Sequence, residues 1–287
     1  MPKTFDKEFL IVDGSHYLNR AYYGVPESAK LPSGLQVNAI YGFMANLRKA
    51  VKLMSPSHIY VIFDSETGIE KKVQKNDSYK ANRDHSDTGM YKQLPLIQRI
   101  LDYLGIKYIE PADQEADDYI GSVANYVHKC GFASTVFSND ADFLQLISNH
   151  IKVLKVGRKS LEIVDEKVFR TTFEFYTSQY VDYLSLKGDS SDNIRGVSGI
   201  GPKTSQNLIK EHGSIDNLFN NIEKIPRKAR ETLLKSRDLI LGNLQILTIN
   251  TEVLDSNLDL EAYSAKDLSA LSESTNYLLS QIGIDTK

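Results

Sequence analysis

The sequence of 287 residues predicts an α/β fold with a mostly parallel sheet flanked by helices. Short runs of β-branched and aromatic residues alternate with stretches of helical periodicity. We expect strands at residues 8–12, 58–63, 107–109, 134–137, 151–156 and 161–164. Most of the intervening segments are long enough for the helical crossovers that parallel strands require.

The expected helices follow from apolar spacing. Apolar residues recur every three or four positions from Ile40 to Met54 and again from Ala116 to Val127, which predicts two amphipathic helices between strands. From about Asp165 onward the predicted strands cease, and we expect helices at 177–187, 203–211, 227–247 and 272–281. The chain therefore divides into an α/β part at 1–165 and a helical part at 166–287.

Residues 66–92 do not follow this alternation of predicted strands and helices. They have almost no apolar periodicity and are rich in Lys and Arg, so they predict a partly helical excursion from the compact domain. Within it, Tyr79 stands close to Lys80 and Arg83, a combination that suits stacking on an unpaired base and binding of its phosphate. A solvated polar loop is the alternative interpretation.

Acidic residues follow three predicted strands. Asp13, Asp64 and the Asp140-x-Asp142 pair each come at a strand's carboxyl end, where ligands bind in open α/β sheets. Five further acids open the helix near residue 116 or lie in the loop after Gly188. The complete set is Asp13, Asp64, Glu115, Asp117, Asp118, Asp140, Asp142, Asp189 and Asp192.

Nine carboxylates in one place need cations. Each close pair repels by about 1 kcal/mol even in water. Oxygen ligands suit Mg²⁺, and two such ions ~4 Å apart can stabilise both the attacking and leaving oxygens of a phosphodiester displacement. Taken alone, Asp13 or Asp64 fits better as a helix cap or turn residue, Asp140-x-Asp142 fits a solvated loop equally well, and Asp117-Asp118 could complement a helix dipole. The joint pattern favours a metal site.

Overall charge at first argues against a nucleic-acid partner, because the net charge is −3 and the isoelectric point is near 6.1. Setting the nine acids aside leaves 28 acidic against 34 basic side chains, a mildly basic body around one acidic site. The single cysteine, Cys130, excludes an internal disulfide. The apolar run from Phe9 to Val12 is too short for a signal peptide or membrane span, so we expect a cytoplasmic protein with no membrane partner.

A Gly-Ile-Gly turn joins two predicted helices at about 177–212, which is the helix-hairpin-helix pattern. Free amides at such a turn can hold a phosphate without reading sequence, and the lysine beside it adds charge. A simple tight turn is the alternative. The candidate binding residues are Ser198, Gly199, Ile200, Gly201, Lys203 and Thr204.

Taken in order, these motifs resemble the 5′ nuclease domain of bacterial DNA polymerase I and the phage and stand-alone bacterial flap endonucleases. The motifs are Val12-Asp13-Gly14, Phe63-Asp64, Tyr79-Lys80-x-x-Arg83, Glu115-Ala116-Asp117-Asp118, Asp140-x-Asp142, Gly188-Asp189-x-Ser191-Asp192-Asn193 and Gly196-Val197-x-Gly199-Ile200-Gly201. The resemblance runs from about Phe9 to Leu247, so we expect a stand-alone bacterial form without a polymerase.

The resemblance implies a PIN-like sheet, a helical arch at about 66–92 and a two-metal site that cleaves DNA at a 5′ flap, nick or 5′ end. It assigns the nine acids to two Mg²⁺ ions, for which Mn²⁺ can substitute, and a K⁺ ion to the hairpin. Lys80 and Arg83 would act on the scissile phosphate, assisted by Arg20, while Tyr79 and Lys72 would bind DNA. Lys72 stands where the family often has arginine, so the bidentate fork is lost there. We expect a monomer.

Three other functions compete with this interpretation. A PIN-type ribonuclease or a magnesium phosphatase would use the same sheet-edge acids, but neither explains the hairpin or the acids Asp189 and Asp192. A non-catalytic, structure-selective DNA-binding protein would lack some of the metal ligands. All nine are present in this sequence.

Overall fold

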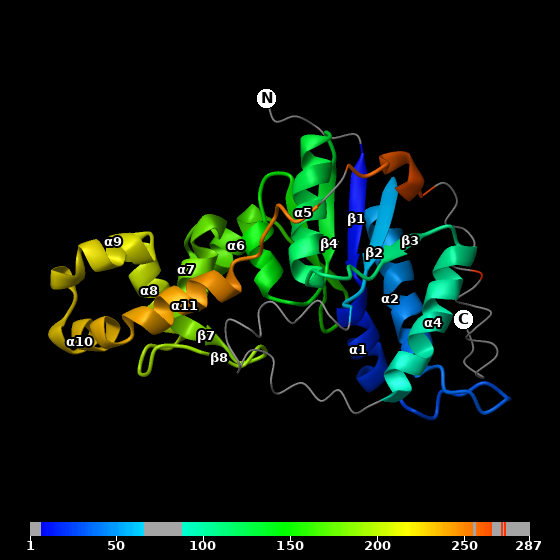
Figure 1. Cartoon of the computed structure of the whole chain (residues 1–287), viewed down its shortest axis with the longest axis horizontal. Helices are drawn as coiled ribbons and strands as arrows, with labels where there is room; N and C mark the ends of the chain where they lie inside the picture. The colour runs from blue at the N-terminus through cyan, green and yellow to red at the C-terminus, as the bar shows by residue number, and fades with distance from the viewer. Residues whose placement is uncertain (1–6, 66–87, 255–256, 266–270, 272, 274–287) are drawn as a thin grey trace.

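The computed structural model describes residues 7–65, 88–254, 257–265, 271 and 273 (Figure 1). Its centre is a six-stranded sheet of order β3-β2-β1-β4-β5-β6, parallel except for β6, which runs antiparallel to β5. The strands are β1 (Glu8–Asp13), β2 (His58–Ile62), β3 (Lys107–Ile109), β4 (Ala133–Phe137), β5 (Ile151–Val156) and β6 (Leu161–Val164). The mostly parallel sheet predicted from the sequence is confirmed.

The register of the central strands brings their carboxyl ends to one level. In the pairing of β1 with β2, Asp13 lies opposite Ile62, and in the pairing with β4, Val12 lies opposite Phe137. The residues that follow these three strands therefore leave the sheet along the same edge. This edge is where the sequence places most of its acids.

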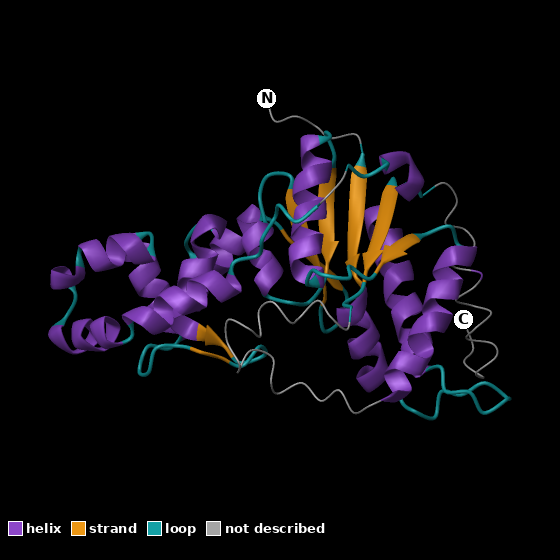
Figure 2. Cartoon of the chain, in the orientation of Figure 1, coloured by secondary structure: helices purple, strands orange, loops and turns teal. Residues whose placement is uncertain are grey.

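Helices cover both faces of the sheet (Figure 2). Because side chains alternate along a strand, Leu10 and Val12 pack on one face and Phe9 and Ile11 on the other. The first face is covered by α1 (Gly14–Gly24), α2 (Asn38–Met54) and α4 (Thr88–Tyr103), and the second by α5 (Ala116–Lys129). The apolar core on the α5 side continues without interruption into the helical part of the chain.

The helical part extends sideways from the sheet as an elongated lobe (Figure 1). Its longer helices are α6 (Glu166–Phe173), α7 (Tyr180–Lys187), α8 (Pro202–His212), α9 (Ile215–Asn220), α10 (Arg227–Lys235) and α11 (Arg237–Leu247). The short strands β7 (Gly188–Asp189) and β8 (Ile194–Arg195) form a hairpin after α7. Short 3-10 helices are η1 (Asp142–Leu146), η2 (Thr177–Gln179), η3 (Ile222–Lys224) and η4 (Leu260–Tyr263).

The structure corrects three details of the sequence-based prediction. The expected helix at 227–247 is two helices separated at Ser236. The apolar pattern hides this break, because Leu233 and Ile240 on its two sides are both buried. Strands do not cease near Asp165, since β7 and β8 lie beyond it. Residues 88–92 belong to α4, whereas the rest of the expected arch and most of the expected helix at 272–281 lie outside the described residues.

No helix in the described part of the chain combines the length and the apolar composition that a membrane crossing requires.

Candidate active site

Asp13 ends β1 and is only 5% exposed. One of its carboxylate oxygens accepts a hydrogen bond from the His16 amide at 2.9 Å, and the other accepts one from the Ser138 hydroxyl at 2.7 Å. Asp13 therefore caps α1 and also faces the carboxyl edge of the sheet. Burial raises its pKa well above the usual value, and the charges of Asp117 and Asp64 raise it further. These three acids lie within electrostatic reach of one another.

The loop after β4 places Asp140 and Asp142 side by side. The Asp142 amide donates to Asp140 Oδ1 at 2.9 Å, which fixes the turn between them. Asp142 is buried, and within the described residues its Oδ1 atom receives no hydrogen bond. Burial raises the pKa of Asp142, and the carboxylates of Asp140, Asp192, Asp117 and Asp189 raise it in that order. Acids from the sheet edge, from α5 and from the lobe therefore lie within electrostatic reach of Asp142.

The hairpin of β7 and β8 brings the lobe's two acids within electrostatic reach of Asp142. Gly188 has a φ of +77°, and a Cβ there would lie 2.2 Å from the Gly196 amide nitrogen, so only glycine fits. This close approach closes the loop, in which Asp189 and Asp192 are both buried. One Asp189 oxygen accepts a hydrogen bond from the Ser191 amide at 2.8 Å.

The remaining two acids open α5. Glu115 occupies the position before the helix, is 4% exposed and does not cap the helix with its side chain. One Asp118 carboxylate oxygen accepts a hydrogen bond from the Asn250 amide at 2.9 Å, so it also holds the segment that follows α11. The electrostatic environments of Asp13 and Asp142 thus include seven of the nine predicted acids. Glu115 is buried at the start of α5, and Asp118 also binds the segment after α11.

This group of side chains fits hard divalent cations. Its donors are carboxylate oxygens, and the buried Asp142 oxygen has neighbours that repel its charge instead of hydrogen-bond donors. Among the described residues, no three His, Cys, Asp or Glu side chains already surround one point as a complete coordination shell would. Mg²⁺ tolerates such a spread arrangement, because it keeps several waters and contacts only one or two carboxylates directly.

Two polar residues that sequence reasoning missed hold the loop after β4. Asn139 exchanges two hydrogen bonds with the Val156 backbone, at 2.8 Å and 3.0 Å, and Ser138 contacts both Asp13 and the Asp140 amide. Both residues stand in the sequence between the end of a predicted strand and the Asp140-x-Asp142 pair, and this position could have identified them as site residues.

Arg20 lies exposed on α1. Burial and the charge of Asp13 raise the pKa of the Tyr17 phenol, and the charge of Arg20 offsets part of this rise, so Arg20 is near this edge. Four predicted residues of the arch lie outside the described residues: Lys72, Tyr79, Lys80 and Arg83.

The Gly-Ile-Gly turn faces open space. Gly199 has a φ of +79°, whereas Gly201 has a φ of −85° and stands directly before α8, with Pro202 as its first residue. A Cβ added to either glycine would meet no atom within 4 Å. Ile200 anchors the turn in the core, and its amide donates to the Val197 carbonyl at 2.9 Å. The neighbouring Ser198, Lys203 and Thr204 are exposed.

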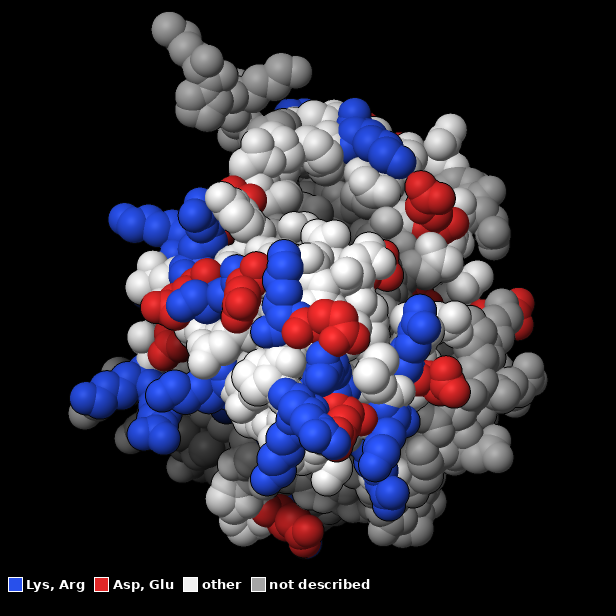
Figure 3. All heavy atoms as spheres, turned by 90° about the vertical axis from the view of Figure 1, so that its left-hand side faces the viewer, with Lys and Arg blue, Asp and Glu red and all other residues white. Residues whose placement is uncertain are grey.

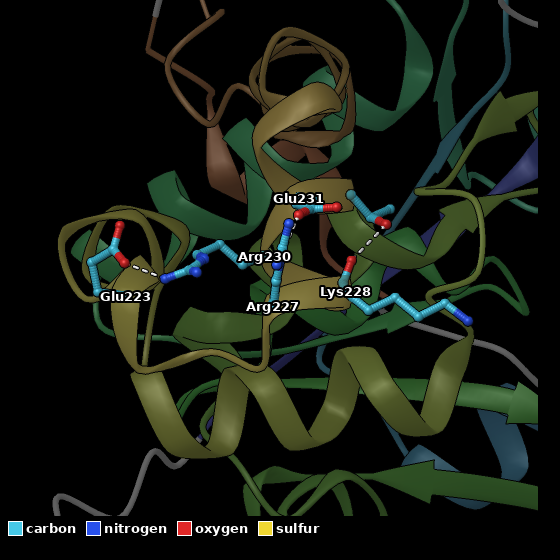
Figure 4. A network of polar contacts seen from close by, with 6 residues as sticks. Glu223, Arg227, Lys228, Arg230 and Glu231 are labelled. Atoms are coloured by element: carbon cyan, nitrogen blue, oxygen red, sulfur yellow. Dashed lines mark hydrogen bonds and ion pairs between the residues drawn. The ribbon is translucent and has the colours of Figure 1, made fainter.

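Cations spread over the end of the lobe, with acids interspersed (Figure 3). In α10, Arg227 pairs with Glu231 at 2.9 Å and Arg230 pairs with Glu223 (Figure 4). The Lys228 ammonium points away from both pairs. Exposed ion pairs of this kind add little stability, so these cations are accessible to an anionic partner at small cost.

Comparison with curated proteins places the chain among nucleases. It is 38% identical over 232 residues to a 5′-3′ exonuclease of Buchnera aphidicola, covering 78% of this chain and 77% of that protein. A 5′-3′ exonuclease of Aquifex aeolicus is 33% identical over 238 residues, with 82% and 81% covered. DNA polymerase I of Streptococcus pneumoniae is 32% identical over 272 residues, but these cover 92% of this chain and only 31% of the polymerase.

Solved structures share the fold. T5 5′-exonuclease with bound zinc has a TM-score of 0.69 at 20% identity, covering 96% of this chain and 100% of the other. A flap endonuclease of bacteriophage T5, in a pseudo-enzyme–product complex with DNA and metal ions, also has a TM-score of 0.69, at 19% identity and with 96% and 99% covered.

Two family models account for most of the chain. Residues 8–174 match the N-terminal resolvase-like domain of 5′-3′ exonucleases, and residues 175–270 match their C-terminal SAM fold. The resemblance drawn from the sequence motifs is confirmed: this chain belongs to the 5′-3′ exonuclease family.

Proposed function

We propose that this chain is a 5′→3′ exonuclease and flap endonuclease that hydrolyses DNA phosphodiester bonds with two Mg²⁺ ions. The observation that carries the proposal is that acids from both parts of the chain raise the pKa of the buried Asp142, while the Gly199–Gly201 turn of the lobe faces open space. The family membership supports the reaction type. The solved T5 structures, one with bound zinc and one with DNA and metal ions, support the choice of ligands.

Each part of the site has its own task. One ion would lie at the sheet edge, held by Asp13, Asp64, Glu115, Asp117, Asp118, Asp140 and Asp142. The second ion would be held by Asp189 and Asp192. Bound Mg²⁺ supplies charge for the attacking and leaving oxygens. Ser138 and the His16 amide orient Asp13 by their hydrogen bonds, so that its remaining lone pairs point to the edge.

The lobe supplies the grip on duplex DNA. Amides of the Gly199–Gly201 turn and the start of α8, with the charge of Lys203, suit a backbone phosphate. A K⁺ ion at this turn is part of the proposal. We further propose that Lys80 and Arg83 act on the scissile phosphate, that Arg20 assists them, and that Tyr79 and Lys72 contact the unpaired strand. The polypeptide would work as a monomer in the bacterial cytoplasm.

A substrate panel tests this function. End-labelled 5′-flap DNA, nicked duplex, single-stranded RNA and a phosphomonoester are incubated with Mg²⁺, with Mn²⁺ or with EDTA. We expect cleavage of the flap and nicked DNA with either metal and none in EDTA. Preferential cleavage of RNA would favour a PIN-type ribonuclease, and hydrolysis of the phosphomonoester alone would favour a phosphatase. Tight flap binding without cleavage would indicate a non-catalytic DNA-binding protein.

A further inference from the structure

Helix α11 is attached by polar side chains at two points, and the two attachments lead to different groups of acids. Asn243, in the middle of the helix, is 3% exposed. Its amide nitrogen donates to the Ser185 carbonyl at 3.0 Å and to the Arg195 carbonyl at 2.8 Å. Ser185 belongs to α7 and Arg195 to β8, so Asn243 joins the two segments that flank the Asp189–Asp192 loop.

The carboxyl end of α11 is attached to the other group. The Gln145 amide nitrogen donates to the Asp142 carbonyl and to the Leu247 carbonyl, both at 2.9 Å, and its oxygen accepts from the Ile249 amide at 3.0 Å. One side chain thus connects the loop that carries Asp142 to the last turn of α11. All three hydrogen bonds have good donor–acceptor distances.

The segment after α11 is then held along α5. Besides the Asp118 contact, the Ser122 hydroxyl donates to the Asn250 carbonyl at 3.2 Å and accepts from the Val253 amide at 2.9 Å. Asn125 donates to the Thr251 carbonyl at 3.2 Å. Of the residues in these side-chain contacts, only Gln145 lies on η1, the element that begins with Asp142.

We propose that Gln145 and Asn243 are positioning residues, which use α11 to hold the Asp189–Asp192 loop in register with the Asp140–Asp142 loop. The inference rests on the proposed two-metal site, because it concerns the spacing between ligands of the two ions. Two-metal chemistry requires ions about 3.5–4 Å apart, so an ångström of slippage between the two parts would separate them. The shared apolar core holds the two parts together, and the hydrogen bonds of Gln145 and Asn243 add a directional constraint on their relative position.

Gln145→Met tests the link, because it keeps side-chain length and deletes all three hydrogen bonds. Asn125→Leu is the matched control: it also removes a hydrogen bond to the segment after α11, but this bond does not involve η1. For each protein, the single-turnover rate on a 5′ flap is measured against Mg²⁺ concentration. The rise of the thermal midpoint with Mg²⁺ and flap binding in Ca²⁺ are measured in parallel.

We expect Gln145→Met to raise the Mg²⁺ concentration for half-maximal rate by about tenfold, the lower end of the cost of losing an outer-shell contact. The thermal midpoint should respond only at correspondingly higher Mg²⁺. Flap affinity in Ca²⁺ should stay near the wild-type value, and Asn125→Leu should match wild type in its metal requirement. Gln145→Asn keeps the amide on a shorter side chain, so its Mg²⁺ requirement should lie between those of wild type and Gln145→Met. This variant replaces Gln145→Met in the test if the methionine variant does not fold.

An unchanged metal requirement in Gln145→Met would overturn the inference, as would an equal rise in Asn125→Leu. Asp142→Asn separates this failure from failure of the proposed site. If Asp142→Asn is inactive while Gln145→Met behaves as wild type, only the positioning role is wrong. If Asp142→Asn cleaves normally, the metal site itself is wrong.

Discussion

The sheet edge and the Gly199–Gly201 turn differ in what they present to the DNA substrate that we propose. At the sheet edge, buried elements hold charged side chains within electrostatic reach of one another, such as Asp142 on η1 and its neighbouring acids. At the turn, Gly199 and Gly201 lack side chains, and a Cβ at either would point into open space. In the proposed function, the first region would concentrate charge for chemistry and the second would expose backbone for binding.

This difference between the two regions predicts that variants of each region will change either the rate of DNA cleavage or the affinity for DNA, but not both. Acids at the edge should matter for cleavage and little for DNA binding, because carboxylates do not attract phosphate. Glycines at the turn should matter for binding and little for the rate once DNA is saturating. The following variants test that separation.

Asp140→Asn should have the largest effect. Asparagine keeps an oxygen for the Asp142 amide, so the turn survives while the charge for the metal is lost. We expect the single-turnover rate in Mg²⁺ to fall at least about a thousandfold, the upper end of the cost of losing one electrostatic stabiliser. Binding of a 5′ flap in Ca²⁺, measured by fluorescence anisotropy, should be retained.

Asp64→Ala extends the same test to the neighbouring strand end. Near-normal turnover in either variant would place the metal site elsewhere. Equal losses of turnover and binding would contradict the separation between the two regions.

Lys80→Ala should have the next largest effect. Lys80 lies outside the described residues, so this prediction rests on its place in the Tyr79-Lys80-x-x-Arg83 motif. A cation that stabilises charge on the scissile phosphate acts mainly on the chemical step, and we expect a loss of roughly a hundredfold in single-turnover rate. Lys80→Arg should restore only part of it, because a planar guanidinium does not replace a compact ammonium. A wild-type rate in Lys80→Ala at saturating DNA would remove the arch from the mechanism.

The acids at the sheet edge were predictable because strand ends can be recognised from a short apolar run followed by Asp. Once β1, β2 and β4 pair in parallel register, Asp13, Asp64 and Asp140 must leave the same edge. The Gly-Ile-Gly turn was predictable for a similar reason, since Pro202 marks the start of a helix. Local patterns were sufficient in both cases.

Long-range contacts left no such pattern. The break at Ser236 interrupts a continuous apolar periodicity, and the two-residue strands β7 and β8 are too short to recognise. The contacts of Asp118 with Asn250 and of Gln145 with Leu247 join residues more than 100 positions apart. A single sequence carries no information on such pairs without the fold.

Gly201→Val should have a smaller effect, confined to binding. Its extended backbone conformation suits any residue, and a Cβ there would meet no atom of the described residues within 4 Å, so the fold should persist. A side chain there would stand between the turn's amides and a phosphate. We expect an affinity loss of about tenfold, close to the value of one hydrogen bond to a charged group, at every DNA sequence tested.

Gly201→Ala should fall between Gly201→Val and wild type in affinity. All three proteins should share one single-turnover rate at saturating DNA. A loss limited to one DNA sequence would contradict the role of the turn in phosphate binding.

The smallest expected effect concerns pH and tests the sheet edge without DNA. Burial and neighbouring acids raise the pKa of Asp142 above its usual value of 3.8 in the folded chain. The folded state therefore keeps a proton that the unfolded state releases, so stability in EDTA should fall as the pH rises from 3.8 through the raised pKa. Mg²⁺ should reverse this loss at higher pH, since it binds the deprotonated carboxylates.

Asp142→Asn removes one buried charge from the cluster. In EDTA at pH 8 its thermal midpoint should exceed that of wild type by roughly 2–4 °C, the equivalent of about 1 kcal/mol in a domain of this size. At pH 5 the difference should be smaller, because wild-type Asp142 is then closer to neutral. Asp113→Asn, which changes an exposed acid outside the cluster, should leave the thermal midpoint unchanged at both pH values. If Asp142→Asn lowers the midpoint at pH 8, the carboxylate is stabilised by protein contacts, and the acids at the sheet edge would not need a cation.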